Sequence, residues 1–203
     1  MKSVKLTLTI LMLAGAAQAE ISANVGFASD YHYRGIFQAS SSVNGGLDFE
    51  KNGFYVGTWA ADVDAGLEVD GYFGYGGNAG DFSYSIGYTG YFYTGDFDDT
   101  YQEINLGAGY GIASIDVALG QYDNFSGPTQ DYTYYALTLE KNGFYGKYAG
   151  FTQDFAGEYI EAGFNTSIVE IDVGIAAIFA NKDLVGENEE SLVLTIGKSF
   201  DLR

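Results

Sequence analysis

The sequence predicts an all-β protein, a transmembrane antiparallel β-barrel of about 12 strands in an up-and-down meander. The first observation is a hairpin pattern at residues 47–63, LDFEKNGFYVGTWAADV, in which two alternating runs flank a Lys-Asn-Gly turn. Asn-Gly is a strong hairpin signal because both residues tolerate positive φ. Nearly the same pattern returns at residues 137–151, LTLEKNGFYGKYAGF. At about fifteen residues per strand and connection, the copies lie about six strands apart, which places both turns at one edge.

The second observation is the N-terminal segment. Lys2 and Lys5 precede an apolar run at residues 6–16 that is too short to span a bilayer, and Ala17-Gln18-Ala19 matches a small-residue cleavage site. A membrane-anchoring helix is disfavoured because the cleavage site follows at once. We therefore expect a secretory signal peptide at residues 1–19 and a single barrel domain at residues 20–203.

The third observation is composition. The chain has 29 glycines, 18 tyrosines and 15 phenylalanines but 1 proline and no cysteine, so disulfides do not hold it together. Glycines scattered within strand patterns, with aromatic residues at strand ends, are typical of outer-membrane barrels. The 27 acidic residues against 9 basic ones give a formal net charge of −18. This balance argues against binding to nucleic acid or to an anionic membrane surface.

The alternating pattern sets the predicted strands and connections. Strands are expected near residues 21–34, 42–50, 55–63, 67–76, 82–93, 101–110, 115–122, 134–140, 160–165, 171–179 and 192–200, and a further strand should begin after the second Lys-Asn-Gly turn. Tight turns and longer polar loops should alternate, as in outer-membrane barrels with periplasmic turns and external loops. Turns are predicted at Asn52, Asn78, Ala113, Asn142 and Val169, and loops near Ser40, Asp64, Asp98, Pro128, Asp154 and Gly186.

The two faces of the strands differ in chemistry. Apolar residues such as Leu106, Val117, Leu137, Val173 and Leu194 should face lipid. The outward set on the third strand is expected to be Tyr55, Trp59, Ala61 and Val63. A periplasmic β-sandwich would bury the apolar faces instead, and alternation alone does not separate the two folds. The opposite, polar face should line a pore: Asn24, Asp30, His32, Arg34, Asp48, Glu50, Glu68, Asp70, Glu103, Asn105, Asp116, Glu140, Glu161 and Asp172.

Two segments carry a resemblance to a known family. ISANVGFASDYHYRGIFQ at residues 21–38, with Ser29-Asp30-Tyr31 followed by Arg34-Gly35, and GFYVGTWAADVD from Gly53 resemble the TorF family of porins, which has the Gcw_chp domain. The resemblance implies an outer-membrane barrel of poorly defined substrate. The C-terminus departs from the usual assembly signal, a final aromatic residue, because Phe200 is followed by Asp201, Leu202 and Arg203.

Catalytic and metal chemistry is weakly indicated, and we predict no catalytic residues, no metal site and no cofactor. His32 is the only histidine, so a lipase-like site would need a serine from another strand, and we favour a polar lumen or rim role. Asp96, Asp98 and Asp99 lack an EF-hand spacing and are interpreted as solvated loop charge rather than a Ca²⁺ site. A glycosidase-like pair at Glu68 and Asp70 is interpreted as pore lining.

The sequence thus favours an outer-membrane porin or narrow channel for passive passage of small cationic or neutral solutes. Alternatives are a structural or adhesive barrel with a plugged lumen and, third, an outer-membrane hydrolase. Expected partners are outer-membrane lipid, lipopolysaccharide, small solutes and the outer-membrane assembly machinery. Because carboxylates outnumber Arg34 and Lys147 on the polar face, we expect weak cation preference, with Arg34 and Asp30 in a constriction or rim network.

Overall fold

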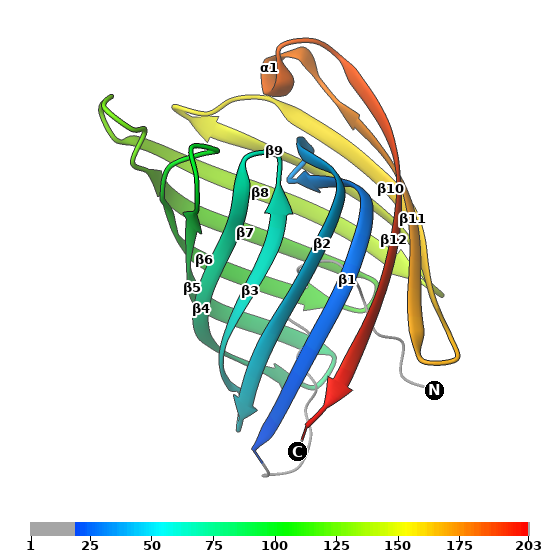
Figure 1. The fold of residues 1–203 in the computed structure, drawn as a ribbon. Coiled ribbons are helices and arrows are strands. Elements are labelled where there is room, and N and C mark those ends of the chain that lie inside the picture. Colours follow the sequence, from blue (N-terminus) through cyan, green and yellow to red (C-terminus); the bar gives the residue numbers. More distant parts are fainter. Residues whose placement is uncertain (1–18, 203) are drawn as a thin grey trace.

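The chain forms one closed antiparallel β-barrel of twelve strands, described for residues 19–202 in a computed structural model (Figure 1). Each strand pairs with its neighbours in sequence, and β1 pairs with β12 to close the sheet. The predicted all-β barrel of about 12 strands in an up-and-down meander is therefore confirmed. The strands are β1 (Glu20–Tyr33), β2 (Ile36–Lys51), β3 (Phe54–Val63), β4 (Gly66–Ala79), β5 (Phe82–Tyr93), β6 (Tyr101–Tyr110), β7 (Ala113–Tyr122), β8 (Gln130–Lys141), β9 (Phe144–Gln153), β10 (Glu158–Ile168), β11 (Ile171–Ala180) and β12 (Glu189–Asp201), and one short helix, α1 (Lys182–Val185), precedes β12.

The two ends of the barrel differ in their connections. Asn52 and Gly53 have φ values of 53° and 82°, and Asn142 and Gly143 have 55° and 84°. Two successive positive φ angles match the twist of a two-residue hairpin, which explains the repeated Lys-Asn-Gly. These turns join β2 to β3 and β8 to β9, six strands apart as predicted. We call the end with these turns the turn end and the opposite end the loop end.

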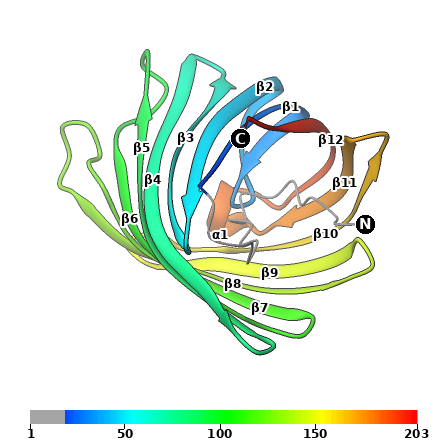
Figure 2. The same ribbon diagram turned by 90° about the horizontal axis from the view of Figure 1, so that it is seen from below.

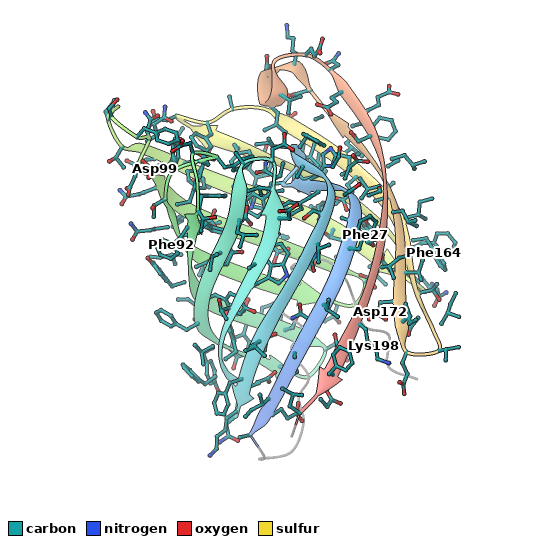
Figure 3. All side chains as sticks on the ribbon, in the orientation of Figure 1. Phe27, Phe92, Asp99, Phe164, Asp172 and Lys198 are labelled. Carbon is teal, nitrogen blue, oxygen red and sulfur yellow. The ribbon has the colours of Figure 1, made fainter. Side chains whose placement is uncertain are left out.

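The barrel has its apolar side chains outside and its carboxylates inside. Ile86, Ile115 and Leu194 are 54%, 54% and 43% exposed, whereas Glu68 and Glu103 are each 1% exposed. Figure 3 shows Phe92 and Phe164 pointing away from the barrel wall on opposite sides. A β-sandwich would bury the apolar faces between two sheets, so the single closed sheet rules out that alternative.

The expected outward face of the third strand is wrong. Tyr55, Ala61 and Val63 are buried, and the register pairs Ala61 with Glu68 and Trp59 with Asp70. Directly paired residues share a face of the sheet, so this set points into the lumen. The error arises because tyrosine and tryptophan count as apolar in a pattern, yet their polar atoms suit a polar interior.

The expected loop near Ser40 is also wrong. Ser40 lies inside β2, and β1 and β2 are joined by a tight turn at Arg34-Gly35, with φ values of 51° and 81°. The loop expected near Asp64 is likewise a tight turn, because only Asp64 and Ala65 separate β3 from β4. The other predicted turn and loop positions lie between strands or within two residues of a strand end. The predicted signal peptide lies outside the described residues except for Ala19.

Tyrosine side chains lie against glycines on the lumen wall. A side chain at Gly74 would collide with the Tyr55 hydroxyl group and with the Ile86 carbonyl oxygen. Gly74 therefore gives Tyr55 the space to lie flat along the inner wall. Gly71, on the outer face of the same strand, has open space where the first carbon of a side chain would lie.

No helix within residues 19–202 has the length and hydropathy needed to cross a membrane. The helix α1 has only 4 residues and is capped by Asn181, whose side chain accepts the Leu184 amide.

We expect Gly74→Ala to destabilise the barrel by about 1–3 kcal/mol because the added methyl group overpacks the Tyr55 site. Gly71→Ala is the matched control and should leave stability unchanged or raise it slightly, since alanine restricts the unfolded chain. Urea unfolding of both variants in lipid vesicles measures the difference. Equal midpoints would contradict the packing of Tyr55 over Gly74.

Candidate functional site

The β1–β2 hairpin turns into the lumen at the loop end. The pairing of β1 with β12 stops at Ala28, and beyond it the Ser29 hydroxyl oxygen, rather than the backbone, accepts the Leu194 amide at 3.0 Å. The register with β2 shifts between Tyr31 and His32, and Ser41 has a φ of 59°. These irregularities bend the hairpin away from the wall, as bulges do. Figures 1 and 2 show its end crossing the interior of the ring of strands.

A buried ion pair joins the hairpin to the opposite wall. Arg34, in the hairpin turn, contacts Glu103 of β6 through its two terminal guanidinium nitrogens, Nη1 to Oε1, and Nη2 to Oε2 at 2.8 Å. The side chains are 12% and 0% exposed. A two-point contact between a planar guanidinium and a carboxylate fixes orientation as well as charge.

Hydroxyl and amide donors complete the coordination of the Glu103 carboxylate. Tyr132 donates to Oε1 at 2.7 Å, while Tyr91 and Asn105 donate to Oε2, each at 3.0 Å. Tyr33 of the hairpin donates to the Tyr91 hydroxyl at 2.7 Å. Oε1 therefore has two partners and Oε2 has three, which offsets the cost of removing this anion from water.

Aromatic rings enclose the Arg34 guanidinium. Its central carbon lies 4.0 Å from the Tyr134 ring centroid and 4.9 Å from that of Tyr33, within the range of cation–π attraction. The Tyr134 and Tyr159 hydroxyls are hydrogen-bonded at 2.9 Å. Gly35 lies so close to the Tyr159 ring that a side chain there would collide with it. The hairpin tip thus contacts β6, β8 and β10 at once.

In the half of the lumen nearer the loop end, which we call the loop half, a hydrophobic cluster packs against the wall formed by β7 to β12. Its members come from the loop-end portions of β7 to β12, and Ile36 of the hairpin and Leu184 of α1 pack against it. The Tyr132 and Phe155 rings are stacked at 4.7 Å between centroids. The buried members are Ala118, Tyr122, Tyr132, Tyr134, Ala136, Ala149, Phe151, Tyr159, Ile178, Ala180 and Val193.

The half of the lumen nearer the turn end, which we call the turn half, is more polar than the loop half. Tyr72 donates to Asp48 at 2.5 Å, and the Asn24 amide donates to the same carboxylate at 3.4 Å. On the far wall Tyr145 donates to Glu161 at 2.6 Å, and Lys147 lies 3.6 Å from the other oxygen of Glu161.

The structure separates the predicted pore-lining residues into groups. Arg34, Glu103 and Asn105 form one cluster, and Asn24 and Asp48 form another. Asp30 does not join Arg34: its carboxylate accepts the Ser40 hydroxyl at 3.1 Å, whereas Arg34 pairs with Glu103. Glu68 and Asp70 lie together on β4. Four further acids lie on four different strands: Glu50 opposite Tyr55, Glu140 opposite Tyr145, Asp116 opposite Ala136, and Asp172 opposite Gly197.

Sequence reasoning missed the tyrosines that organise this site, namely Tyr31, Tyr33, Tyr91, Tyr132 and Tyr134. Their place in the alternating pattern could have found three of them. Tyr91, Tyr132 and Tyr134 occupy the alternate strand positions that face the lumen, as the lumen carboxylates do on their strands.

His32 meets a serine, but not in the arrangement of a hydrolase. His32 Nε2 lies 3.1 Å from the Ser191 hydroxyl oxygen. In a catalytic triad an acid orients the histidine through its other nitrogen. Here His32 Nδ1 is buried without a hydrogen-bond partner in the described chain, and Glu189 accepts from Ser191 instead, at 3.4 Å.

The acidic loop between β5 and β6 uses its carboxylates internally. Asp98 accepts the Tyr101 and Tyr122 hydroxyls at 2.9 and 2.8 Å, and Asp99, labelled in Figure 3, accepts the Phe125 amide at 2.6 Å. Across residues 19–202, no three His, Asp or Glu side chains are grouped as a candidate metal site.

Residues 13–192 match the family model described as "Bacterial protein of unknown function (Gcw_chp)", and the chain belongs to this family. The resemblance seen at residues 21–38 is confirmed at this level. A search of curated proteins finds no match.

Solved structures share the fold at low sequence identity. A chain solved in work on in-meso crystallization of membrane proteins has a TM-score of 0.61 and 12% identity, with 90% of this chain and 84% of that chain covered. This likeness supports the barrel fold alone. OccK2 (OpdF) of Pseudomonas aeruginosa, solved with glucuronate, has a TM-score of 0.46 and 12% identity, covering 94% of this chain and 68% of that one.

A BenF-like porin of Pseudomonas fluorescens Pf-5 gives a TM-score of 0.45 and 10% identity. The match covers 90% of this chain and 58% of the porin, so the chain spans little more than half the porin's length. These two porin likenesses are too weak to assign a solute.

We expect Arg34→Met to destabilise the barrel by about 3–5 kcal/mol, because it leaves the buried Glu103 charge without its cation. The double variant Arg34→Met/Glu103→Gln should recover a large part of this loss, since both charges are gone. Lys198→Ala, which removes the exposed pair with Glu170 at 3.4 Å, is the control and should cost at most about 1 kcal/mol. Urea unfolding in vesicles measures all three, and additive losses in the double variant would contradict a coupled pair.

Proposed function

We propose that this protein is an outer-membrane channel of the TorF type for passive passage of small cationic or neutral solutes. The observation that carries the proposal is a closed barrel with an apolar exterior and an acidic interior. Exposed apolar side chains are favourable when lipid surrounds the barrel. Carboxylates in the interior suit a lumen through which polar solutes pass.

The exterior supports placement in a bilayer. Strands of 10 to 16 residues suffice to cross hydrocarbon at a tilt. Exposed aromatic residues gather near the turn end, as in the interfacial girdles of outer-membrane barrels. They are Phe54, Tyr75, Phe82, Tyr110, Phe144 and Phe200. By the usual asymmetry, the turn end faces the periplasm and the loop end faces outside.

The same exterior defines the proposed partners. Outer-membrane lipid and lipopolysaccharide would contact the apolar belt, and the outer-membrane assembly machinery would insert the barrel. Phe200 faces outward near the end of β12. Phe200 is the aromatic residue of β12 that this machinery would contact.

The charges of the turn half favour cations. Asp48, Asp116 and Glu140 lie on lumen-facing positions there, and Lys147 is already paired with Glu161. Carboxylates around a narrow path raise the local cation concentration and exclude anions. Glu103 contributes little to this field, because Arg34 neutralises it.

The inserted hairpin makes the proposed path narrow at the loop end. Its tip contacts β6, β8 and β10, and Ile36 packs into the hydrophobic cluster. We therefore expect small single-channel conductance compared with open porins of sixteen strands.

The packed cluster also favours a second candidate, a structural barrel with a plugged lumen. Planar-bilayer recording of the refolded protein decides between the two. Discrete single-channel steps support the channel. Their absence, with the barrel folded by circular dichroism, supports the plugged barrel.

Under a KCl gradient, we expect the wild-type reversal potential to report weak cation preference that is strongest at low salt, because salt screens the lumen charges. Asp116→Asn should reduce the preference, since it removes a lumen charge. Asp62→Asn removes the same charge from the outer face of β3 and should leave it unchanged. Anion preference, or equal potentials for Asp116→Asn and wild type, would overturn the electrostatic account.

Membrane embedding has a separate test on adjacent residues of β12. Leu194 points outward and Thr195 faces the lumen. Leu194→Arg should cost about 2–4 kcal/mol in vesicles if it lies near the midplane, and Thr195→Arg much less. Equal costs would mean that these strands do not face lipid.

A further inference from the structure

Two buried carboxylates on β4 lack the partners that buried charges need. Glu68 and Asp70 are two residues apart on one strand, so both point into the lumen, and each is 1% exposed. Tyr31 donates to Glu68 Oε1 at 2.7 Å. Glu68 Oε2 and both oxygens of Asp70 have no hydrogen-bond partner among the described residues.

No lysine or arginine of the described chain forms an ion pair with these two carboxylates. Arg34 is held in two-point contact by Glu103, and Lys147 is paired with Glu161 of β10. The other lysines within residues 19–202 lie at the ends of strands or in α1, namely Lys51, Lys141, Lys182 and Lys198. An isolated buried carboxylate is strongly unfavourable, so a positive species must accompany the pair or a proton must neutralise it.

The surroundings of the pair are aromatic. The register places Asp70 between Trp59 of β3 and Tyr91 of β5, and Glu68 beside Tyr93. The Tyr31 ring meets the Trp59 ring edge-on, with 5.8 Å between centroids. Aromatic faces attract cations that have lost part of their hydration.

We propose that Glu68 and Asp70 form a binding site for the primary ammonium group of a small amine. An ammonium group has three N–H donors, and the pair presents three unpartnered oxygens. The aromatic residues beside the pair would contact the alkyl part. A divalent metal fits less well, because no third His, Asp or Glu joins the pair in the described chain. This site rests on the proposed channel function and names its substrate class.

The test uses the full-length protein in lipid nanodiscs, titrated with methylammonium chloride at constant ionic strength. Trp59 is the chain's single tryptophan and lies opposite Asp70, so its fluorescence reports on the site. Calorimetry of the same titration gives the dissociation constant. We expect a saturable change in both signals.

Asp70→Asn should weaken binding at least tenfold, since it removes a charge and an acceptor while preserving shape. This variant should fold, because it relieves an unpaired buried charge. Asp62→Asn, which removes the same charge from the outward face of β3, is the matched control and should change binding less than twofold.

Three results would overturn the site: no saturable signal in the wild type, equal affinity in Asp70→Asn, or equal saturation with NaCl. The first would mean that a proton alone neutralises the pair. Conductance without amine binding would contradict the amine site and support the channel. Amine binding without conductance would support the amine site and contradict the channel.

Discussion

The buried contact between Arg34 and Glu103 is the interaction on which the interior of this barrel depends. It joins residues 69 positions apart and holds the β1–β2 hairpin across the lumen. Without it, the hairpin would carry an uncompensated guanidinium into a region of tyrosine rings. The surrounding hydroxyls of Tyr91 and Tyr132 make the carboxylate a fully coordinated anchor, so the hairpin position is set by directional bonds as well as by packing.

A barrel with an apolar exterior must provide hydrogen-bond partners for its polar groups in the interior. In this barrel the buried carboxylates differ in the number of partners they have. Glu103 has a partner for each oxygen, whereas Asp70 has none within the described chain. Both acids sit at the loop half of neighbouring walls, so the difference is local rather than a consequence of depth. Coordinated carboxylates hold the fold together, and unpartnered ones are available to a ligand.

Much of the fold could be predicted from the sequence because its signals are local. Period-2 alternation gave the strand count, and Lys-Asn-Gly gave two turns at the same end. Individual site residues such as Arg34, Glu103 and Asp70 were also placed on the polar face. Their pairing could not be predicted, because it depends on the bend of the hairpin and on contacts between distant strands. The inward face of β3 was missed because Tyr55 and Trp59 read as apolar.

In the proposed channel, the inserted hairpin limits passage through the barrel. Ala28 and Ser42 are directly paired, so residues 29–41 can be replaced by an Asn-Gly turn that closes the hairpin at the wall, combined with Glu103→Gln so that no buried charge loses its partner. Single-channel conductance of this variant, compared with the wild type in the same bilayer, tests the claim most directly. The account predicts a larger conductance in the shortened variant. An unchanged conductance would contradict it.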